Sequence, residues 1–337
     1  MKEQETSGQG EFPYFDAHCD TIYRIEESGE GQALEMGSRE EQLAYYGAAD
    51  KLRQNEGHID LTRTRRCFSR YGQFFALYWD TARLAPGEGF ACCSRLHDRF
   101  LREMEENRDL VVPCRSGQEV DRAAADGKAA ALLSIEGAGL LDCDLRHLET
   151  AAAWGVRLLN PVWNRANCLS GSNCEDPERG LSERGREFIR RMEALSIRAD
   201  VSHLSDPGFW DLVHVAQGPV VASHSNARSV CPHPRNLTDD QFKAIRDSGG
   251  VVGLNLYSAF VGRHGTMEEL IEHVEHFLGL DGEKTLCIGG DMDGCESLAA
   301  GMQGCQDMPK LYAALKKRGY GKTLLEDLFW NNLRRII

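Results

Sequence analysis

Five residues able to bind a metal ion stand at or near the ends of short apolar segments. They are histidines and carboxylates, and a mixed set of imidazole nitrogens and carboxylate oxygens suits zinc better than manganese or cobalt. In the first segment the two candidates are two positions apart, so a strand of period two places both on one side. The predicted ligands are His18, Asp20, Glu136, His203 and His224.

Each of these residues taken alone has an ordinary structural interpretation. A single histidine after an apolar segment is more often hydrogen bonded within the fold than bound to a metal. Glu136 is different, because an ionised carboxylate in an apolar strand costs several kcal/mol unless a cation or hydrogen bonds compensate. The convergence of five such residues at one edge of a barrel favours a metal centre.

Other histidines fit a metal site less well than this set. His58 and Asp60 repeat the two-residue spacing, but the basic stretch that follows them does not fit a buried strand. His273 and His276 lie three positions apart on a predicted helix, with no third ligand at suitable spacing. We therefore expect these two histidines on a solvated helix face.

The elements that must position the ligands form a repeating pattern. Eight apolar, β-branched or aromatic segments are predicted as strands, with helical patterns between the later ones, which is typical of parallel βα units. Capping boxes begin two of the helices, at Thr238 with Gln241 and at Thr266 with Glu269. We predict an α/β fold, a (β/α)₈ barrel of the TIM type, whose strand ends form one rim. The predicted strands span residues 12–17, 73–79, 130–135, 156–162, 197–202, 219–223, 250–256 and 285–290.

Two stretches lack clear barrel periodicity. Residues 24–70 and 80–128 are predicted as helical insertions after the first and second strands. Roughly 250 residues already suffice for one α/β barrel, and the chain shows no internal repeat or low-complexity tract. Residues 1–337 are therefore predicted as one domain, with a flexible N-terminus over residues 1–11.

The chain is acidic, with a formal net charge of -13 at pH 7. Nucleic acids and anionic membranes carry the same sign of charge, so neither is an expected partner. No apolar run approaches the ~18 residues that span a bilayer, and the polar N-terminus is unlike a signal peptide. No two of the twelve cysteines form a C-x₂-C pair, and we expect free thiols in a cytoplasmic protein.

Six sequence strings together resemble the membrane (renal) dipeptidase family of the metal-dependent amidohydrolase-like superfamily. Each string alone is weak evidence, but all six occur in the family's order between about residue 13 and residue 336. The resemblance implies a (β/α)₈ fold and a binuclear centre with two zinc ions per chain. The strings are DAHCDT, SIEG, DVSHLS, ASHSNARSVCPHPRNLTDD, GGDMDG and WNNLRRI.

Matched position by position, the resemblance also implies roles for these residues. His18 and Asp20 would bind one zinc, His203 and His224 the other, and Glu136 would bridge both and so take part in catalysis. The implied activity is hydrolysis of the amide bond of small dipeptides by a metal-bridging hydroxide, since zinc lowers the pKa of a bound water from 15.7 toward about 7.

Two further residues complete the implied catalytic set. Asp291 matches the acid/base that moves a proton from the attacking water to the leaving amine. Arg235 matches the arginine that holds the substrate carboxylate, which a guanidinium can grip through two parallel hydrogen bonds. Asp293 lies in the same loop as Asp291, and we expect it to be structural.

The sequence departs from the family at one substrate position. Where the family's dipeptidases commonly have a histidine after the fourth strand, this chain has Trp163, followed by Asn164. Tryptophan cannot bind zinc but can donate one hydrogen bond from its indole. Both residues are predicted to contact substrate, and Trp163 is predicted to form an apolar wall that narrows the pocket.

Two alternatives remain at this point. The chain could be another amidohydrolase, acting on a non-peptide amide or a lactone, because a fold does not determine a function. It could also be a metal-binding homologue without catalysis, although such a protein has little need of a proton shuttle. The sequence leaves open the dipeptide substrate, whether its C-terminal residue is D or L, and whether the protein is a homodimer.

Overall fold

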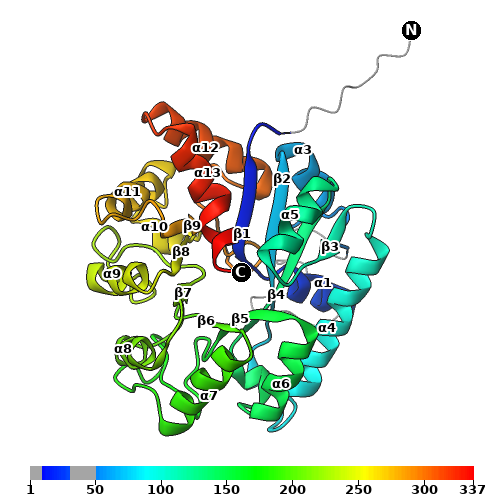
Figure 1. Ribbon diagram of the computed structural model, residues 1–337, viewed down its shortest axis with the longest axis vertical. Helices are drawn as coiled ribbons and strands as arrows, with labels where there is room; N and C mark the ends of the chain where they lie inside the picture. Colours follow the sequence, from blue (N-terminus) through cyan, green and yellow to red (C-terminus); the bar gives the residue numbers. More distant parts are fainter. Residues whose placement is uncertain (1–9, 31–50) are drawn as a thin grey trace.

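The strands of the computed structural model, which describes residues 10–30 and 51–337, form a barrel surrounded by helices (Figure 1). Neighbouring strands are parallel, in the order β6-β5-β4-β2-β1-β9-β8-β7. A bridge between Asp200 and Val221 connects the two ends of this order, so eight strands form a nearly closed barrel. The strands are β1 (Pro13–Cys19), β2 (Arg70–Leu77), β3 (Val111–Pro113), β4 (Ala129–Glu136), β5 (Val156–Asn160), β6 (Arg198–Ala199), β7 (Val221–Ala222), β8 (Val251–Leu254) and β9 (Leu286–Ile288).

The predicted barrel is confirmed, and all eight predicted strands overlap observed ones. The prediction missed β3, which lies inside the second stretch predicted as a helical insertion. This strand pairs with β4. Three residues are too few to show a sequence period. The segment is a strand because it pairs with Ala129–Ala131 of β4. Residues 1–9 of the predicted flexible terminus and residues 31–50 of the first insertion lie outside the described residues.

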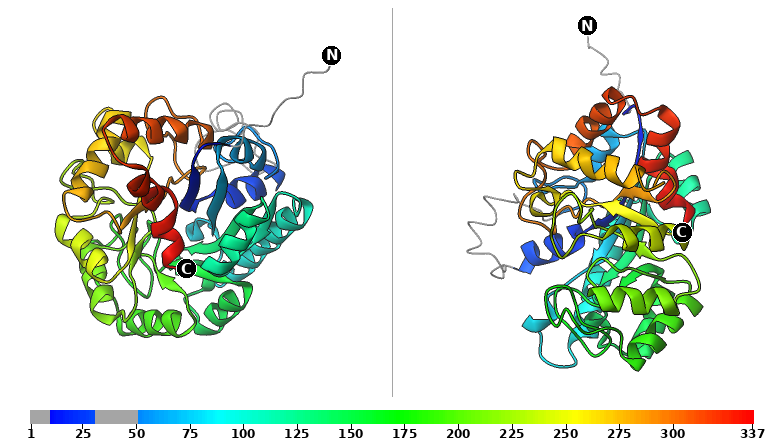
Figure 2. Two further views of the ribbon diagram at one scale, coloured as in Figure 1. Left: turned by 45° about the horizontal axis from the view of Figure 1, so that its top comes forward. Right: turned by 90° about the vertical axis from the view of Figure 1, so that its left-hand side faces the viewer.

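Most helices cover the outside of the barrel, as both views of Figure 2 show. In α7, Ser182 caps the first turn and Phe188, Ile189 and Met192 form the buried face. Both predicted capping boxes are present, at the starts of α9 and α11. The α-helices are α1 (Thr21–Glu30), α3 (Leu61–Cys67), α4 (Gly89–Glu106), α5 (Gly117–Ala125), α6 (Leu145–Trp154), α7 (Glu183–Ala194), α8 (Asp206–Val215), α9 (Asp239–Asp247), α10 (Ser258–Val261), α11 (Met267–Leu278), α12 (Met308–Lys317), α13 (Lys322–Glu326) and α14 (Asn332–Arg335). Shorter helical turns are η1 (Thr81–Arg83), η2 (Ala138–Leu141), η3 (Cys305–Asp307) and η4 (Asp327–Asn331).

An irregularity in β1 determines which side chains reach the mouth of the barrel. Phe15 and Ala17 belong to the inner apolar cluster, to which most strands and Trp330 contribute. A regular strand would turn the next residue, His18, away from that interior. The register of β1 against β2 shifts between Asp16 and Cys19, and this bulge turns His18 toward the site.

The expectation that His273 lies on a solvated helix face is wrong. His273 is fully buried in α11. Its Nδ1 accepts a hydrogen bond from Ala227 N at 3.1 Å, and its Nε2 lies 2.7 Å from Val261 O. Burial lowers the pKa of His273 to about 4, so the ring stays neutral and links α11 to α10. His276, three positions on, is partly buried and pairs with Asp239.

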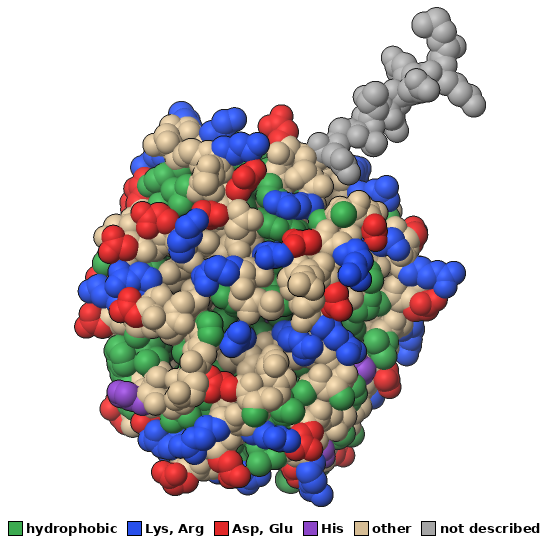
Figure 3. All heavy atoms as spheres, in the orientation of Figure 1, with side chains coloured by type: hydrophobic (Ala, Val, Ile, Leu, Met, Phe, Trp, Pro, Cys, Tyr) green, Lys and Arg blue, Asp and Glu red, His purple; other side chains and the backbone are tan. Residues whose placement is uncertain are grey.

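The surface carries charges of both signs, which are intermixed over the face in Figure 3. Ion pairs join neighbouring helices, such as Arg334 of α14 with Asp121 of α5. All twelve cysteines are free thiols, as predicted. Among the described residues, every helix is too short or too polar to cross a membrane.

Candidate metal centre

The five predicted ligands come from four strand ends and meet at one rim of the barrel. His18 lies in β1 and Asp20 directly follows it, while Glu136 is the last residue of β4. His203 and His224 come shortly after β6 and β7. All five side chains are nearly fully buried. Parallel strands end on the same side of a barrel, which is why residues so distant in sequence lie together here.

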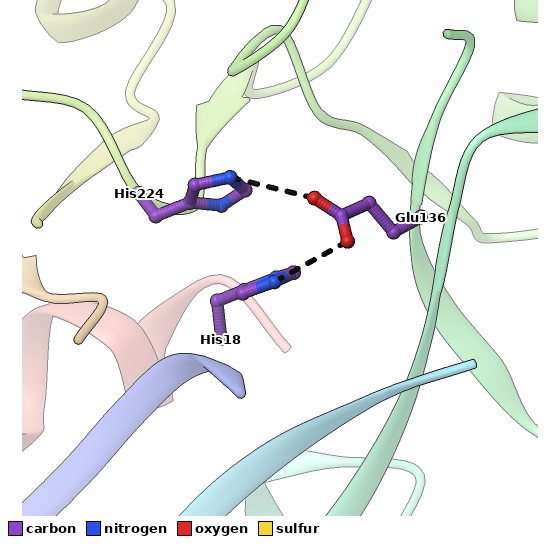
Figure 4. Close-up of side chains that lie close together, drawn as sticks. All are labelled: His18, Glu136 and His224. Atoms are coloured by element: carbon purple, nitrogen blue, oxygen red, sulfur yellow. Dashed lines mark ion pairs between the residues drawn. The ribbon is translucent and has the colours of Figure 1, made fainter. Parts of the chain in front are cut away.

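Glu136 lies between two groups of ligands, and its two oxygens face different groups. Oε2 is 3.7 Å from His18 Nε2, and His18 Nε2 is in turn 3.2 Å from Asp20 Oδ2. Oε1 is 2.8 Å from His203 Nε2 and 3.6 Å from His224 Nε2. Figure 4 shows the carboxylate turned toward both His18 and His224. This geometry suits a carboxylate that bridges two cations.

Polar neighbours hold the rings of the two later histidines with Nε2 pointing at Glu136. His203 Nδ1 lies 3.1 Å from Asn164 Oδ1, and His224 Nδ1 lies 2.6 Å from Ser223 Oγ. Such partners commonly orient metal-binding histidines. Asn164, predicted to bind substrate, borders the cavity and also contacts His203.

The electrostatics of the site favour a cation. Burial, followed by the charge of Asp20, raises the pKa of Glu136 well above its usual value. Burial alone would lower the pKa of His18, but Glu136, Asp20 and Asp291 raise it to about 10. Burial and the charge of Arg235 lower the pKa of His203, which keeps that ring neutral as a metal ligand requires.

The donor atoms allow two overlapping three-residue sets. Ligand atoms of His18, Glu136 and His224 lie within 4.8 Å of one another, as do those of His18, Asp20 and Asp291. Asp20 Oδ1 is buried without a hydrogen-bond partner, which a cation would satisfy. Nitrogen and carboxylate oxygen donors at this spacing fit zinc.

Asp291 lies beside these ligands in a strained turn after β9. Its φ of 56° is in the left-handed region, which non-glycine residues adopt mainly where the structure demands it. Oδ1 is 3.9 Å from His18 Nε2, and Oδ2 accepts a hydrogen bond from Asn255 Nδ2 at 3.0 Å. Burial raises the pKa of Asp291.

Sequence reasoning missed Asn255, which holds Asp291. Its position carried a signal, because it directly follows β8 and polar residues at strand ends build the sites of barrel enzymes. Asp293, expected to be structural, accepts hydrogen bonds from Thr21 Oγ1 at 2.6 Å and from His58 N at 2.7 Å.

A cavity of about 1130 Å³ opens over the cluster. Arg235 borders it, held by Ser202 O, by His203 Nε2 at 3.1 Å and by the ring of Phe260 at 5.4 Å. Trp163 forms part of the wall and packs against Tyr78, with the ring centroids 4.9 Å apart. The cavity is thus polar where the ligands and Arg235 lie and aromatic at its side.

Comparisons with known proteins show to which family the chain belongs. The chain is 38% identical to an uncharacterised protein from the pqqA 5′ region of Klebsiella pneumoniae over 236 residues, 66% of this chain and 87% of that protein. It is 33% identical to an uncharacterised dipeptidase of Schizosaccharomyces pombe, covering 96% of this chain and 80% of that one. The crystal structure of a metallopeptidase from Rhodobacter sphaeroides, liganded with a phosphinate mimic of the dipeptide L-Ala-D-Ala, superposes with a TM-score of 0.82 at 28% identity, covering 96% and 98% of the two chains. The model of the membrane dipeptidase family (peptidase family M19) matches residues 3–337, and the chain therefore belongs to that family.

Proposed function

We propose that this protein is a zinc-dependent dipeptidase with two zinc ions per chain. The observation that carries the proposal is the position of Glu136, whose two oxygens face His18 on one side and His203 and His224 on the other. His18 and Asp20 would hold one ion, His203 and His224 the other, and Glu136 would bridge them. When bound, zinc supplies an acidified water and polarises the scissile carbonyl.

The protein's own groups would do the rest of the chemistry. Asp291 would take the proton of the attacking water and deliver it to the leaving amine, and its raised pKa suits that exchange. Arg235 would bind the free carboxylate of the substrate and so select short peptides. The ligand named for the Rhodobacter sphaeroides relative, a mimic of L-Ala-D-Ala, supports a dipeptide substrate and makes a C-terminal D-residue worth testing.

The direct test is metal analysis of the purified protein followed by assays with a substrate panel. We expect two equivalents of zinc and hydrolysis of L-L or L-D dipeptides. The panel includes a non-peptide amide and a lactone. Hydrolysis of these compounds alone would favour a different amidohydrolase, and bound zinc without any turnover would favour a non-catalytic homologue.

The free thiols also support a proposed location. None of the twelve cysteines forms a disulfide, and Cys168 and Cys174 are exposed. Exposed thiols persist best in a reducing compartment, so we propose the cytoplasm.

Replacing Arg235 by Met should impair recognition of the substrate carboxylate while the metals stay bound. Hydrogen bonds to a charged group contribute roughly 1.5–3 kcal/mol, which corresponds to a loss in kcat/KM of about 10- to 150-fold. The measurement is kcat/KM for a dipeptide and for the matching dipeptide amide, which lacks the carboxylate. Equal losses for both substrates would contradict the assignment. Arg165→Met, which removes another cavity arginine, is the control.

Replacing Trp163 by Ala should widen the range of dipeptides that are hydrolysed. The indole narrows the cavity beside His203, with ring centroids 6.4 Å apart, and its removal should favour bulky side chains. Changes in an apolar pocket alter selectivity by roughly 1–3 kcal/mol, so kcat/KM for bulky over Ala-containing dipeptides should rise about 10-fold or more. Trp154, which packs on Phe90 outside the cavity, provides the control Trp154→Ala. An unchanged ratio in Trp163→Ala with metals intact would assign Trp163 to packing alone.

A further inference from the structure

Several seams of the barrel have sparse backbone pairing, and two of them lie beside the candidate metal-site residues. β1 and β9 share a single pair in register, Asp16 with Ile288, before an isolated bridge between Cys19 and Met292. Only the bridge between Asp200 and Val221 joins the β6 and β7 ends of the described barrel. β5 with β6 and β7 with β8 pair over two residues each, and β2 with β4 over six. At the β1–β9 and β6–β7 seams a buried aspartate accepts a hydrogen bond from the neighbouring strand's side of the seam.

Asp16 connects β1 to the loop that carries Asp291. Its Oδ1 accepts hydrogen bonds from His18 N at 3.0 Å on its own strand and from Gly290 N at 2.8 Å across the seam. Oδ2 accepts a hydrogen bond from the Tyr14 hydroxyl. Glycine at position 290 leaves room for this carboxylate, because a Cβ there would lie 2.8 Å from Oδ2.

Asp200 makes the corresponding connection at the second seam. Its Oδ1 accepts hydrogen bonds from Ser202 N at 3.0 Å and from Ser202 Oγ at 2.7 Å. The same oxygen accepts a hydrogen bond from Ser223 N, across the seam, at 3.0 Å. Ser202 Oγ in turn accepts a hydrogen bond from His224 N at 3.1 Å.

Both carboxylates bind amides at or next to candidate metal-site residues. The Asp16 donors are His18 itself and the residue before Asp291. The Asp200 donors precede His203 and His224 directly. A carboxylate suits this task, because it is short and its acceptor sites can take several N–H groups at once.

We propose that Asp16 and Asp200 are positioning residues of the metal centre. Each carboxylate replaces missing backbone pairing at its seam, and together they set the spacing between the strands that carry His18, Asp291, His203 and His224. The link to zinc rests on the proposed function, whereas the link to the seams does not.

The first test is hydrogen exchange of the metal-free full-length protein, followed by mass spectrometry. In Asp16→Ala we expect faster exchange in peptides that cover β1 and residues 286–292. In Asp200→Ala we expect faster exchange in peptides that cover residues 198–204 and 221–225. Glu103→Ala is the matched control, because Glu103 is also a buried carboxylate that accepts a backbone N–H, from Leu52, but lies in α4. Uniform acceleration, or the same local pattern in the control, would overturn the proposal.

The second test is zinc affinity by competition with a chelator. Loss of partners that orient metal ligands typically weakens metal binding about 10- to 100-fold, and we expect this in both alanine variants but not in Glu103→Ala. Asp16→Asn and Asp200→Asn keep one acceptor oxygen in the same place, so they should fold and restore much of the affinity and exchange protection. Exchange at the seams equal to wild type in both the alanine and the asparagine variants would refute the proposal. A wild-type protein that binds no zinc would refute the proposed function alone, since the exchange pattern still reports on the seams.

Discussion

Glu136→Gln should lose most of its bound metal and nearly all activity. A glutamine offers one acceptor oxygen and one NH₂ group, so it can face either His18 or the pair His203 and His224 with an oxygen, but never both. The loss in affinity should exceed the roughly 10- to 100-fold typical of partners that only orient a ligand. Zinc content after gel filtration, measured together with dipeptide hydrolysis, checks this prediction.

The same substitution should stabilise the metal-free protein. Burial and the charge of Asp20 raise the pKa of Glu136, so at neutral pH an ionised carboxylate at this position is costly without a cation. A neutral amide removes that cost, and we expect the metal-free variant to melt at a higher temperature than the metal-free wild type. Glu103→Gln, which neutralises a buried carboxylate outside the cavity, should leave zinc content unchanged. Two zinc equivalents and full activity in Glu136→Gln would show that Glu136 is not the bridge.

The barrel could be predicted because its strands are short, apolar and regularly followed by polar residues. The rule that parallel strands end on one rim then brings Glu136 and His224 together without any knowledge of tertiary contacts. The three-residue strand β3 escaped prediction because its pairing with β4, rather than its own pattern, makes it a strand.

The finer geometry of the site could not be predicted, because it depends on exceptions to local rules. Strand periodicity places His18 and Asp20 together, yet only the bulge in β1 allows His18 to follow Ala17 and still reach the mouth of the barrel. His273 lies three positions after Leu270 and four before Phe277, on the buried face of α11, so the helical period indicates its burial. Its hydrogen bonds with Ala227 and Val261 depend on how α11 packs and could not be predicted.

Asp291→Asn should keep its metals and lose about 10²- to 10⁴-fold in kcat, the usual scale for loss of a general acid/base. Asparagine tolerates the left-handed backbone at this position, so the turn should survive. Asn255 Nδ2 donates to Oδ2 of residue 291 and will therefore bind the amide oxygen of the variant. The amide NH₂ group then faces His18, and it cannot accept a proton from the attacking water.

Asp293→Asn is the matched control for this substitution. Asp293 lies in the same loop with a φ of 65° and is buried, but its carboxylate accepts hydrogen bonds from Thr21 and His58. We expect this control to lower the melting temperature and to leave kcat nearly unchanged. Because Asp291 also forms a possible three-residue set with His18 and Asp20, zinc content separates two roles. Lost zinc in Asp291→Asn would make Asp291 a ligand, whereas retained zinc with wild-type kcat would exclude it as the proton shuttle.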